Sequence, residues 1–520
     1  MGDSSEEKED SSFPLEETTF RRGFDVVDSE LDLDVNLKER LIVGTATLHI
    51  KRSKPFVKIL RLNFRQAEIK SVSANGVSTR YERLDFLRNI DCKGRRDAPM
   101  FYANYRTAIV AANRGELFVY LSDEQDESEN IDLVVKYVLR DPRAGIRFSG
   151  SEMYTCDSPV VAGAVASGGS GCRCWFPCVD DPKSVCPYTV RVTVQRGMTV
   201  LCSGRLVEKK EDSMISTTTH TYKLTRPIPA RTLGLAIGNF IMNSNNETGG
   251  QVRSYVASEA SVLHPSSSST TNLMKCTKNC DKMLEWIEQY LQYRYPFNES
   301  KGETTEVGGG GGGEEEEEEE EEEYTKVHHK QVFVHGLEIP DIRAVTPSHV
   351  LPVGGMFSGI KVFSTLVLLP VSLLHDSQRH LDLSDHTNLT QVYGLACQWF
   401  GCLVRAKTYA DSWILESLSG HVLNHYVKST KGGGAYMSRI DTINEMIVRC
   451  TLVSGRKGRS ELSDLLSSSI KESSSSSSSI GGSSRRKSGM NATMLCKPLH
   501  PASVAVLSLC PNRMCFFFVF

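Results

Sequence analysis

The chain has 520 residues, 40 % of them hydrophobic, so it is long enough for two or three domains with real cores. Its net charge of −3 excludes a uniformly basic nucleic-acid binder. No run of about 18 apolar residues could span a bilayer, and the acidic start lacks the pattern of a secretory signal. We therefore expect a soluble intracellular protein whose 15 cysteines are reduced thiols.

Residues 1–19 are acidic and serine-rich, which predicts a disordered tail. From residue 20 onward, short runs of β-branched residues alternate with turns, as in an all-β domain. We expect this N-terminal β domain to cover 20–247 and to end with a strand near 234–240. Its clearest strands are 41–50, 117–121, 131–138 and 188–194.

The segment Trp175-Phe176-Pro177-Cys178-Val179-Asp180 carries a carboxylate between two prolines. We interpret Asp180 as a turn carboxylate that fixes backbone amides, in preference to a binding residue. Four cysteines cluster around this segment, but their spacing matches no pair of zinc ligands. We expect buried thiols, with a structural zinc ion as the alternative, at Cys172, Cys174, Cys178 and Cys186.

A second domain of mixed helices and strands is expected over 248–453. Its first helix has a stripe of core residues, followed by a strand at 331–334. A low-complexity insertion at 301–328 contains a glycine run and a glutamate run and has no means of packing. The adjacent His328 and His329 would make a poor preformed metal site. The expected core stripe is Met283, Trp286, Ile287, Tyr290 and Leu291.

Apolar residues three and four apart predict another helix with one buried face, in which Tyr393 and Cys397 share a side. A further helix should run past Glu416 and stop at the glycines 432–434, with one more helix after them. Residues 454–520 form an atypical low-complexity tail with serine runs and short basic groups. The apolar stripe of the helix that contains Tyr393 consists of Leu389, Val392, Ala396, Trp399, Phe400 and Leu403.

The stretch from Tyr393 to Gly401, followed by Trp413-Ile414-Leu415-Glu416, resembles the zinc-binding helix of the M1 family of metallo-aminopeptidases. In that family the pattern is His-Glu-Leu-Ala-His-Gln-Trp-Phe-Gly, followed at a fixed spacing by a glutamate. The resemblance places Tyr393 and Cys397 at the two histidines and Gly394 at the general-base glutamate. Glu416 alone keeps the family's residue. A hydrolytic zinc site needs about three ligands, an open position for water and a base, which this set does not supply.

A second family feature is a Gly-Ala-Met-Glu-Asn loop, whose glutamate holds the amino end of the substrate. The matching segment is Gly354-Gly355-Met356-Phe357-Ser358, and Phe357 cannot pair with an ammonium group. We therefore expect no catalytic residue, no metal ion and no cofactor. The degenerate positions are Tyr393, Gly394, Cys397, Glu416 and Phe357.

One branch of the family has these losses: the large TBP-associated subunits of the general transcription factor TFIID. The chain resembles this branch in Gln398-Trp399-Phe400-Gly401-Cys402, in Asp411-Ser412-Trp413-Ile414-Leu415 and in the segment around Trp175. The resemblance implies an N-terminal β saddle followed by an α+β thermolysin-like domain, which we expect to be truncated here.

The same resemblance implies a nuclear, non-catalytic scaffold that takes part in core-promoter recognition and preinitiation complex assembly. Its implied partners are other TBP-associated subunits, TATA-binding protein and promoter DNA, the last of these directly or indirectly. It implies no membrane and no small-molecule substrate. One alternative is a divergent zinc aminopeptidase whose rebuilt site uses Cys397, Glu416 and a distant histidine. Another is a pseudo-peptidase scaffold in a different complex.

Overall fold

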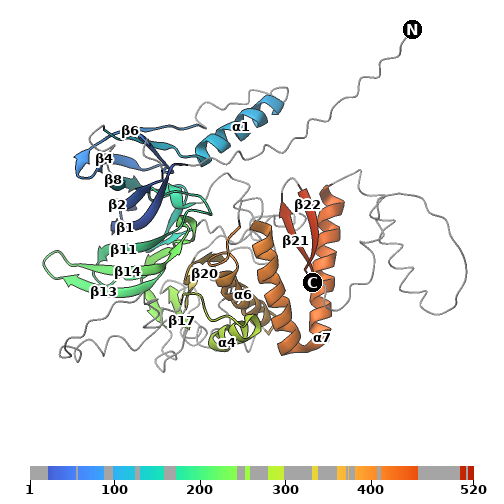
Figure 1. Ribbon diagram of the computed structural model, residues 1–520. Coiled ribbons are helices and arrows are strands. Elements are labelled where there is room, and N and C mark those ends of the chain that lie inside the picture. The colour runs from blue at the N-terminus through green and yellow to red at the C-terminus, as the bar shows by residue number, and fades with distance from the viewer. Residues whose placement is uncertain are drawn as a thin grey trace, which may run out of the picture.

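A computed structural model shows two layers of sheet and a helical layer beyond them (Figure 1). None of the helices in the described ranges combines the length and the apolar character that crossing a bilayer requires. Phe357, the tail 1–19, the insertion 301–328 and the basic groups after residue 454 lie outside these ranges. The structure describes residues 22–53, 57–86, 98–122, 129–156, 171–242, 252–257, 279–297, 331–337, 360–370, 373, 381–406, 412–454, 504–510 and 513–519.

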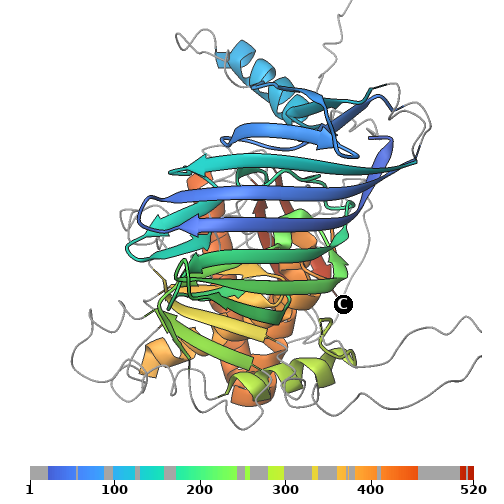
Figure 2. The ribbon, with the colours of Figure 1, turned by 90° about the vertical axis from the view of Figure 1, so that its left-hand side faces the viewer.

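The N-terminal part is built on an eight-stranded sheet in the order β13-β14-β11-β1-β2-β8-β4-β5, which faces the viewer in Figure 2. β1 pairs in parallel with β11, and the other neighbours are antiparallel. Along β2 the buried and outward residues alternate, as the sequence predicts. The strands are β1 (Phe24–Asn36), β2 (Leu41–Arg52), β4 (Glu68–Ala74), β5 (Val77–Ser78), β8 (Asn130–Arg140), β11 (Cys186–Gln195), β13 (Arg205–Asp212) and β14 (Thr217–Ile228).

Two smaller sheets complete this part, in the orders β3-β7-β6 and β12-β15-β10-β9. One helix, α1 (Ala98–Asn113), corrects the expectation of a purely β domain. Its alanine-rich sequence has a high intrinsic helix propensity. The remaining elements are β3 (Ile59–Leu62), β6 (Arg80–Arg83), β7 (Leu117–Tyr120), β9 (Ile146–Ser149), β10 (Glu152–Thr155), η4 (Gly171–Cys174), β12 (Thr199–Cys202), η5 (Ala230–Thr232) and β15 (Leu235–Gly238).

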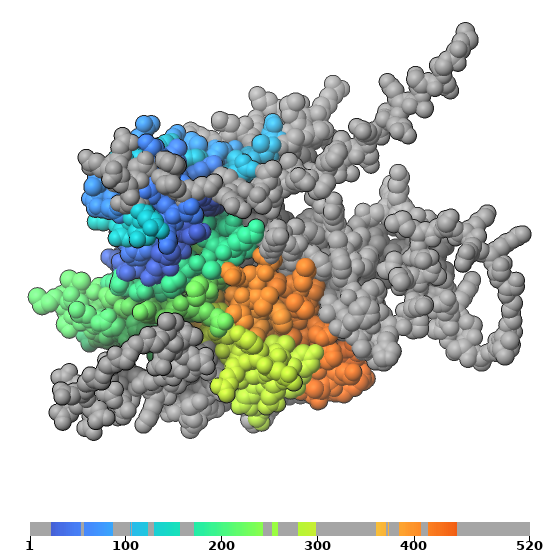
Figure 3. Space-filling model, viewed as in Figure 1, coloured from blue at the N-terminus to red at the C-terminus, as the bar shows by residue number. Residues whose placement is uncertain are grey.

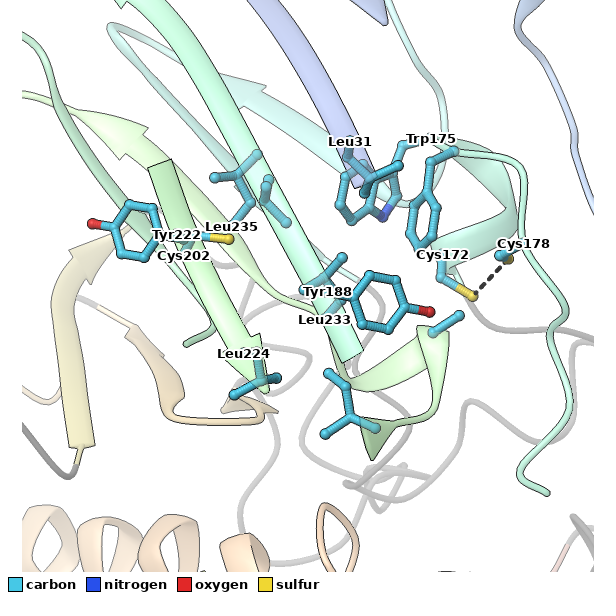
Figure 4. Packing of buried hydrophobic residues seen from close by; sticks show 14 of the residues in the cluster. Leu31, Cys172, Trp175, Cys178, Tyr188, Cys202, Tyr222, Leu224, Leu233 and Leu235 are labelled. Atoms are coloured by element: carbon cyan, nitrogen blue, oxygen red, sulfur yellow. Dashed lines mark hydrogen bonds between the residues drawn. The ribbon is translucent and has the colours of Figure 1, made fainter. Parts of the chain in front are cut away.

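The core of the N-terminal part gathers around Trp175, which is 2 % exposed (Figure 4). Its ring meets Phe176 edge to face, with ring centroids 4.4 Å apart. The sulfur atoms of Cys172 and Cys178 lie 3.7 Å apart as buried thiols that form no disulfide. Cys174 and Cys186 are also buried thiols outside any disulfide, as the buried-thiol interpretation expects. In the described part of the chain no group of three or more His, Cys, Asp or Glu side chains could hold a metal ion.

The second part contains a five-stranded sheet in the order β16-β17-β18-β20-β19. β17, β18 and β20 run parallel, and helices cover the sheet. A hairpin of β21 and β22 lies beside the helices (Figure 1). The elements are β16 (Phe240–Met242), β17 (Val252–Ala257), α4 (Cys280–Leu291), β18 (Gln331–Leu337), β19 (Lys361–Phe363), β20 (Leu366–Pro370), α6 (Leu381–Trp399), α7 (Ser412–Ser454), β21 (Val504–Cys510) and β22 (Arg513–Val519).

Helix α6 differs from its expected form in two ways. It ends at Trp399, because Gly401 turns the chain with a φ of 139°, so Phe400 and Leu403 lie beyond the helix. From Thr390 to Trp399 every residue is buried, so the expectation of one buried face is wrong. Packing between α7, α4 and the strand β19 buries this part of the helix all round.

The predicted stop at the glycines is found inside α7. Gly432 has φ 87° and ψ 175°, and it divides α7 into two helical arms. The arms fold back on each other, as Figure 1 shows. Arg439 Nε in the second arm donates a hydrogen bond of 2.6 Å to Asn424 Oδ1 in the first.

Candidate functional site

Three of the four described degenerate positions meet between α6 and α7. Tyr393 and Cys397 share one side of α6, as their spacing predicts, and Tyr393 donates a hydrogen bond to the sulfur of Cys397. Glu416 of α7 lies close enough to act electrostatically on both side chains. A buried phenol, a buried thiol and a half-buried carboxyl group therefore lie together.

Burial governs the ionisation of this cluster. Loss of water raises the pKa of Cys397 to about 12, despite a hydrogen bond from its thiol to Ser419 Oγ at 3.5 Å. The pKa of Tyr393 rises well above its usual value, first through burial and then through the neighbouring Cys397 and Glu416. Burial alone raises the pKa of Glu416 to about 8. At neutral pH the cluster is therefore largely uncharged.

Gly394, on the sheet side of α6, faces the five-stranded sheet. A Cβ atom built there would lie 3.0 Å from Cδ1 of Ile360 and 3.2 Å from Cγ1 of Val367. Both neighbours are buried aliphatic side chains. The space that a longer side chain would need at position 394 is therefore already filled by apolar atoms.

A second feature, which the sequence did not predict, is a cavity of about 580 Å³ between α4 and α7. Tyr290 is 37 % exposed and lines it, so its assignment to the core is wrong. The buried side of α4 carries Met283 and Ile287, as predicted, together with Cys280 and Leu284. The surface of α4 lies directly beside that of α7 (Figure 3). The residues that line the cavity are Trp286, Gln289, Tyr290, His425, Lys428 and Ser429.

The rings at this cavity are stacked. Trp286 and Tyr290 are nearly parallel at 5.0 Å, and Tyr290 stacks on His425 at 5.3 Å. His421 lies next to them and contacts both Tyr290 and His425. The spacing of His421 and His425, one helical turn apart, is the sequence signal that could have predicted this side of α7.

Asp180 of the N-terminal part is not the turn carboxylate that the sequence suggested. Its side chain is completely buried and pairs with Arg173 at 2.6 Å and with Arg231 at 2.8 Å. Burial opposes ionisation, but the two guanidinium groups outweigh it and hold the pKa of Asp180 well below its usual value. Asp180 therefore joins η4 to η5 and serves the packing of the domain.

Comparison with known proteins identifies a family model, individual proteins and solved structures that are similar to this chain. Residues 25–230 match the family model of the peptidase M1 N-terminal domain. This segment is therefore similar to peptidase M1 N-terminal domains. The eight-stranded sheet and the core around Trp175 lie within or almost within the matched residues.

Over about 80 % of its length, the chain is similar to proteins named transcription initiation factor TFIID subunit 2. It is 22 % identical to the Drosophila melanogaster protein over 436 residues, which are 80 % of this chain and 30 % of that protein. With the Danio rerio protein it shares 24 % over 438 residues, which are 81 % of this chain and 31 % of that protein. The chain thus spans about a third of the length of these relatives. They confirm the resemblance to the TFIID branch.

Solved structures confirm the fold class. Yeast LTA4 hydrolase in complex with bestatin matches with a TM-score of 0.56 and 13 % identity, over 85 % of this chain and 56 % of that one. A variant of the M1 zinc metallopeptidase from Deinococcus radiodurans matches with a TM-score of 0.51 and 16 % identity, over 84 % of this chain and 77 % of that one. The chain has the fold of an M1 peptidase.

Proposed function

We propose that this chain is a non-catalytic scaffold subunit of TFIID, which uses an M1-peptidase-like body as a binding surface. The observation that carries the proposal is its similarity to TFIID subunit 2 proteins along about 80 % of its length. In this role it takes part in core-promoter recognition and preinitiation complex assembly in the nucleus. Its partners are other TBP-associated subunits, TATA-binding protein and, directly or through them, promoter DNA.

The residues at the family's zinc positions support the absence of peptidase activity. The M1 fold implies a zinc ion held by imidazole and carboxylate groups, with a second carboxylate as base. Here Tyr393 donates its hydroxyl hydrogen to Cys397, and apolar side chains occupy the space beside Gly394. These residues do not fit a hydrolytic zinc ion, and we derive no reaction step through one.

Affinity purification of the tagged full chain from nuclear extract tests the scaffold role. Co-purification of TATA-binding protein and several TBP-associated subunits is the expected result, with an untagged extract as the control. Recovery of the chain from cytosol alone, free of these proteins, would contradict it. Recovery in a different nuclear complex would support a pseudo-peptidase scaffold of another kind.

Hydrolysis of aminoacyl-coumarin substrates by the purified chain tests the enzyme alternative. We expect no turnover above buffer. Turnover that disappears in Glu416→Ala while the fold is retained would establish a rebuilt aminopeptidase. The Glu208→Ala variant is a suitable control, because Glu208 is exposed on β13, away from α6 and α7.

A further inference from the structure

The cavity between α4 and α7 has a chemistry that the proposed function does not use. Its volume of about 580 Å³ falls within the roughly 300–1,000 Å³ that is usual for ligand sites. Gln289 on α4 and Lys428 on α7 line it and are both exposed, so the cavity opens to solvent. A segment of another protein can therefore enter it from the surface.

The lining of the cavity is positively charged. It contains the ammonium group of Lys428, and none of the described residues that line it carries a carboxylate. Burial first, and then the nearby Lys428, lowers the pKa of His425, which favours a neutral imidazole. Lys428 thus supplies the charge that a ligand meets at neutral pH, and this charge favours an anion.

The Lys428 ammonium group is held in position without being neutralised. It lies 5.5 Å from the centroid of the Tyr436 ring on the second arm of α7, which is within the range of a cation–π contact. Lys431, three residues further along α7, instead pairs with Asp385 at 2.5 Å. In the part of the chain that the structure describes, no carboxylate forms such a pair with Lys428. A carboxylate from outside this part can take that place.

The α4 wall of the cavity favours the same kind of ligand. The side-chain amide of Gln289 and the indole N–H of Trp286 are hydrogen-bond donors on this wall. Tyr290 stacks between Trp286 at 5.0 Å and His425 at 5.3 Å, so the faces of its ring are covered and its edge remains for a ligand. The edge of an aromatic ring is the positive part of its quadrupole. Donors and ring edges therefore attract a carboxylate as the ammonium group does.

We propose that this cavity binds an acidic peptide segment of a partner protein. One carboxylate of the segment binds Lys428 and Gln289 through charge-assisted hydrogen bonds, and its methylene groups pack against Trp286 and Tyr290. Charge complementarity with the lining selects the acidic side chain, and the exposed rim admits a chain segment that enters and leaves the cavity. The proposal goes beyond the role in TFIID and does not depend on it.

Fluorescence anisotropy of a labelled hexaglutamate peptide, titrated with the purified full chain at low salt, tests the site. In every chain tested, serines replace the glutamates 314–323, because that run could compete for the cavity. We expect saturable binding in this background. Lys428→Met, which removes the charge but keeps the length of the side chain, should weaken binding about ten-fold or more. Gln289→Leu should weaken it several-fold.

Matched controls separate this cavity from general attraction to lysines. Lys210→Met removes another exposed lysine, on the distant strand β13, and should keep the affinity of the background. A hexaglutamine peptide should bind about ten-fold or more weakly than hexaglutamate. Equal affinities in Lys428→Met and Lys210→Met, or no binding of hexaglutamate by the background, would overturn the proposal. Tighter binding of a six-residue oligothymidylate would overturn the assignment to an acidic peptide.

Carbodiimide cross-linking gives a test that does not depend on whether the variants fold. The reagent activates a carboxylate of hexaglutamate, and a lysine amine in contact with it then forms an amide bond. Mass spectrometry of the digested background chain should identify Lys428 as the main linked lysine. Linking of Lys428 no stronger than that of Lys210 would reject the site. Both measurements use the isolated chain, so their outcome is separate from its co-purification with TFIID subunits.

Discussion

Arg173 and Asp180 form an ion pair with no exposure to solvent, in which Arg173 Nε donates to Asp180 Oδ2 at 2.7 Å. The other carboxylate oxygen of Asp180 accepts a hydrogen bond of 2.8 Å from Arg231. The backbone N–H of Asp180 donates to Oδ1 of Asn63 at 3.1 Å. Asp180 thus joins Asn63 through its backbone, and Arg173 and Arg231 through its buried carboxylate.

Removing this carboxylate should leave the buried Arg173 with only the more distant Glu116, at 3.4 Å, as a carboxylate partner among the described residues. We expect Asp180→Asn to lower the free energy of unfolding by about 3–5 kcal/mol, measured by urea denaturation. Asp141→Asn is the matched control, because Asp141 also pairs with an arginine, Arg40, but both side chains are largely exposed. Its effect should stay within about 1 kcal/mol. Equal losses in the two variants would contradict a special role for burial.

The same pair predicts acid sensitivity. The folded-state pKa of Asp180 lies below its unfolded value of about 3.9, so its stabilising effect is present above that pH. Stability should fall as the pH drops below about 4, towards the lower folded-state pKa. The urea midpoint of the parent chain should therefore decline more steeply between pH 4 and pH 2 than that of Asp180→Asn. Parallel declines would show that other carboxyl groups cause the acid sensitivity.

Two glycines in helices give a matched test of the filled space behind α6. An added Cβ at Gly394 meets Ile360 and Val367, whereas one at Gly420 of α7 meets nothing within 4 Å. Gly420→Ala should stabilise by up to about 1 kcal/mol through helix propensity. Gly394→Ala should raise the free energy of unfolding by less than this, or lower it. Gly394→Glu should lower the free energy of unfolding by about 3 kcal/mol or more, because it overpacks the space and buries a carboxylate.

Thermal unfolding followed by circular dichroism would rank these glycine variants. Adding Ile360→Ala to Gly394→Glu should restore part of the lost stability, because it removes the nearest contact. If Gly394→Glu folds as well as the parent without that relief, the space is not filled as described.

Elements that depend on short-range sequence patterns, such as strands and helix breaks, could be predicted from the sequence. The alternation from Leu41 to Ile50 predicted β2, and the glycines at 432–434 predicted the break in α7. The end of α6 was placed too late because apolar spacing continues through Phe400 and Leu403, although Gly401 turns the chain.

Features that depend on distant partners could not be predicted in the same way. Periodicity places Trp286 and Tyr290 on one face of α4, but it does not show where the covering α7 ends and a cavity begins. Asp180 was assigned to a turn because its partner Arg231 lies 51 residues away along the chain. The closeness of Glu416 to Tyr393 and Cys397 was expected only through a family resemblance.

Glu416 should make stability depend on pH near neutrality. Burial raises its folded-state pKa to about 8. The stability that the protonated side chain contributes to the folded chain is therefore fully present below the unfolded pKa of about 4.3. That stability is lost progressively as the pH rises towards 8. We expect Glu416→Gln to be more stable than the parent at pH 8.5 by roughly 1–3 kcal/mol, because the half-buried side chain is partly screened.

The check on Glu416 is urea denaturation at pH 5 and at pH 8.5. Glu208→Gln on the exposed strand β13 is the control and should leave the pH dependence of the parent unchanged. A Glu416→Gln chain that loses stability between these pH values as steeply as the parent would refute the assignment.

Gln398 lies on α6 next to the degenerate position Cys397 and has a structural role. Its side-chain oxygen accepts a hydrogen bond of 2.9 Å from the backbone N–H of Thr365, and its nitrogen donates one of 2.9 Å to the carbonyl of Phe363. These bonds tie α6 to the turn between β19 and β20. The turn requires support, because Thr365 has a φ of 60°, which is uncommon for a residue with a β-branched side chain.

Gln398→Leu keeps a similar volume but leaves both backbone groups buried without this partner. We expect a loss of about 2–4 kcal/mol in the free energy of unfolding, since each unpaired buried group costs roughly 1–3 kcal/mol. Amide hydrogen exchange at Thr365 should accelerate more than exchange in β1, because the turn opens locally. Gln195→Leu, at an exposed position that ends β11, should change stability by less than about 0.5 kcal/mol. If Gln398→Leu and Gln195→Leu lower the free energy of unfolding by equally small amounts, the hydrogen bonds of Gln398 do not stabilise the turn.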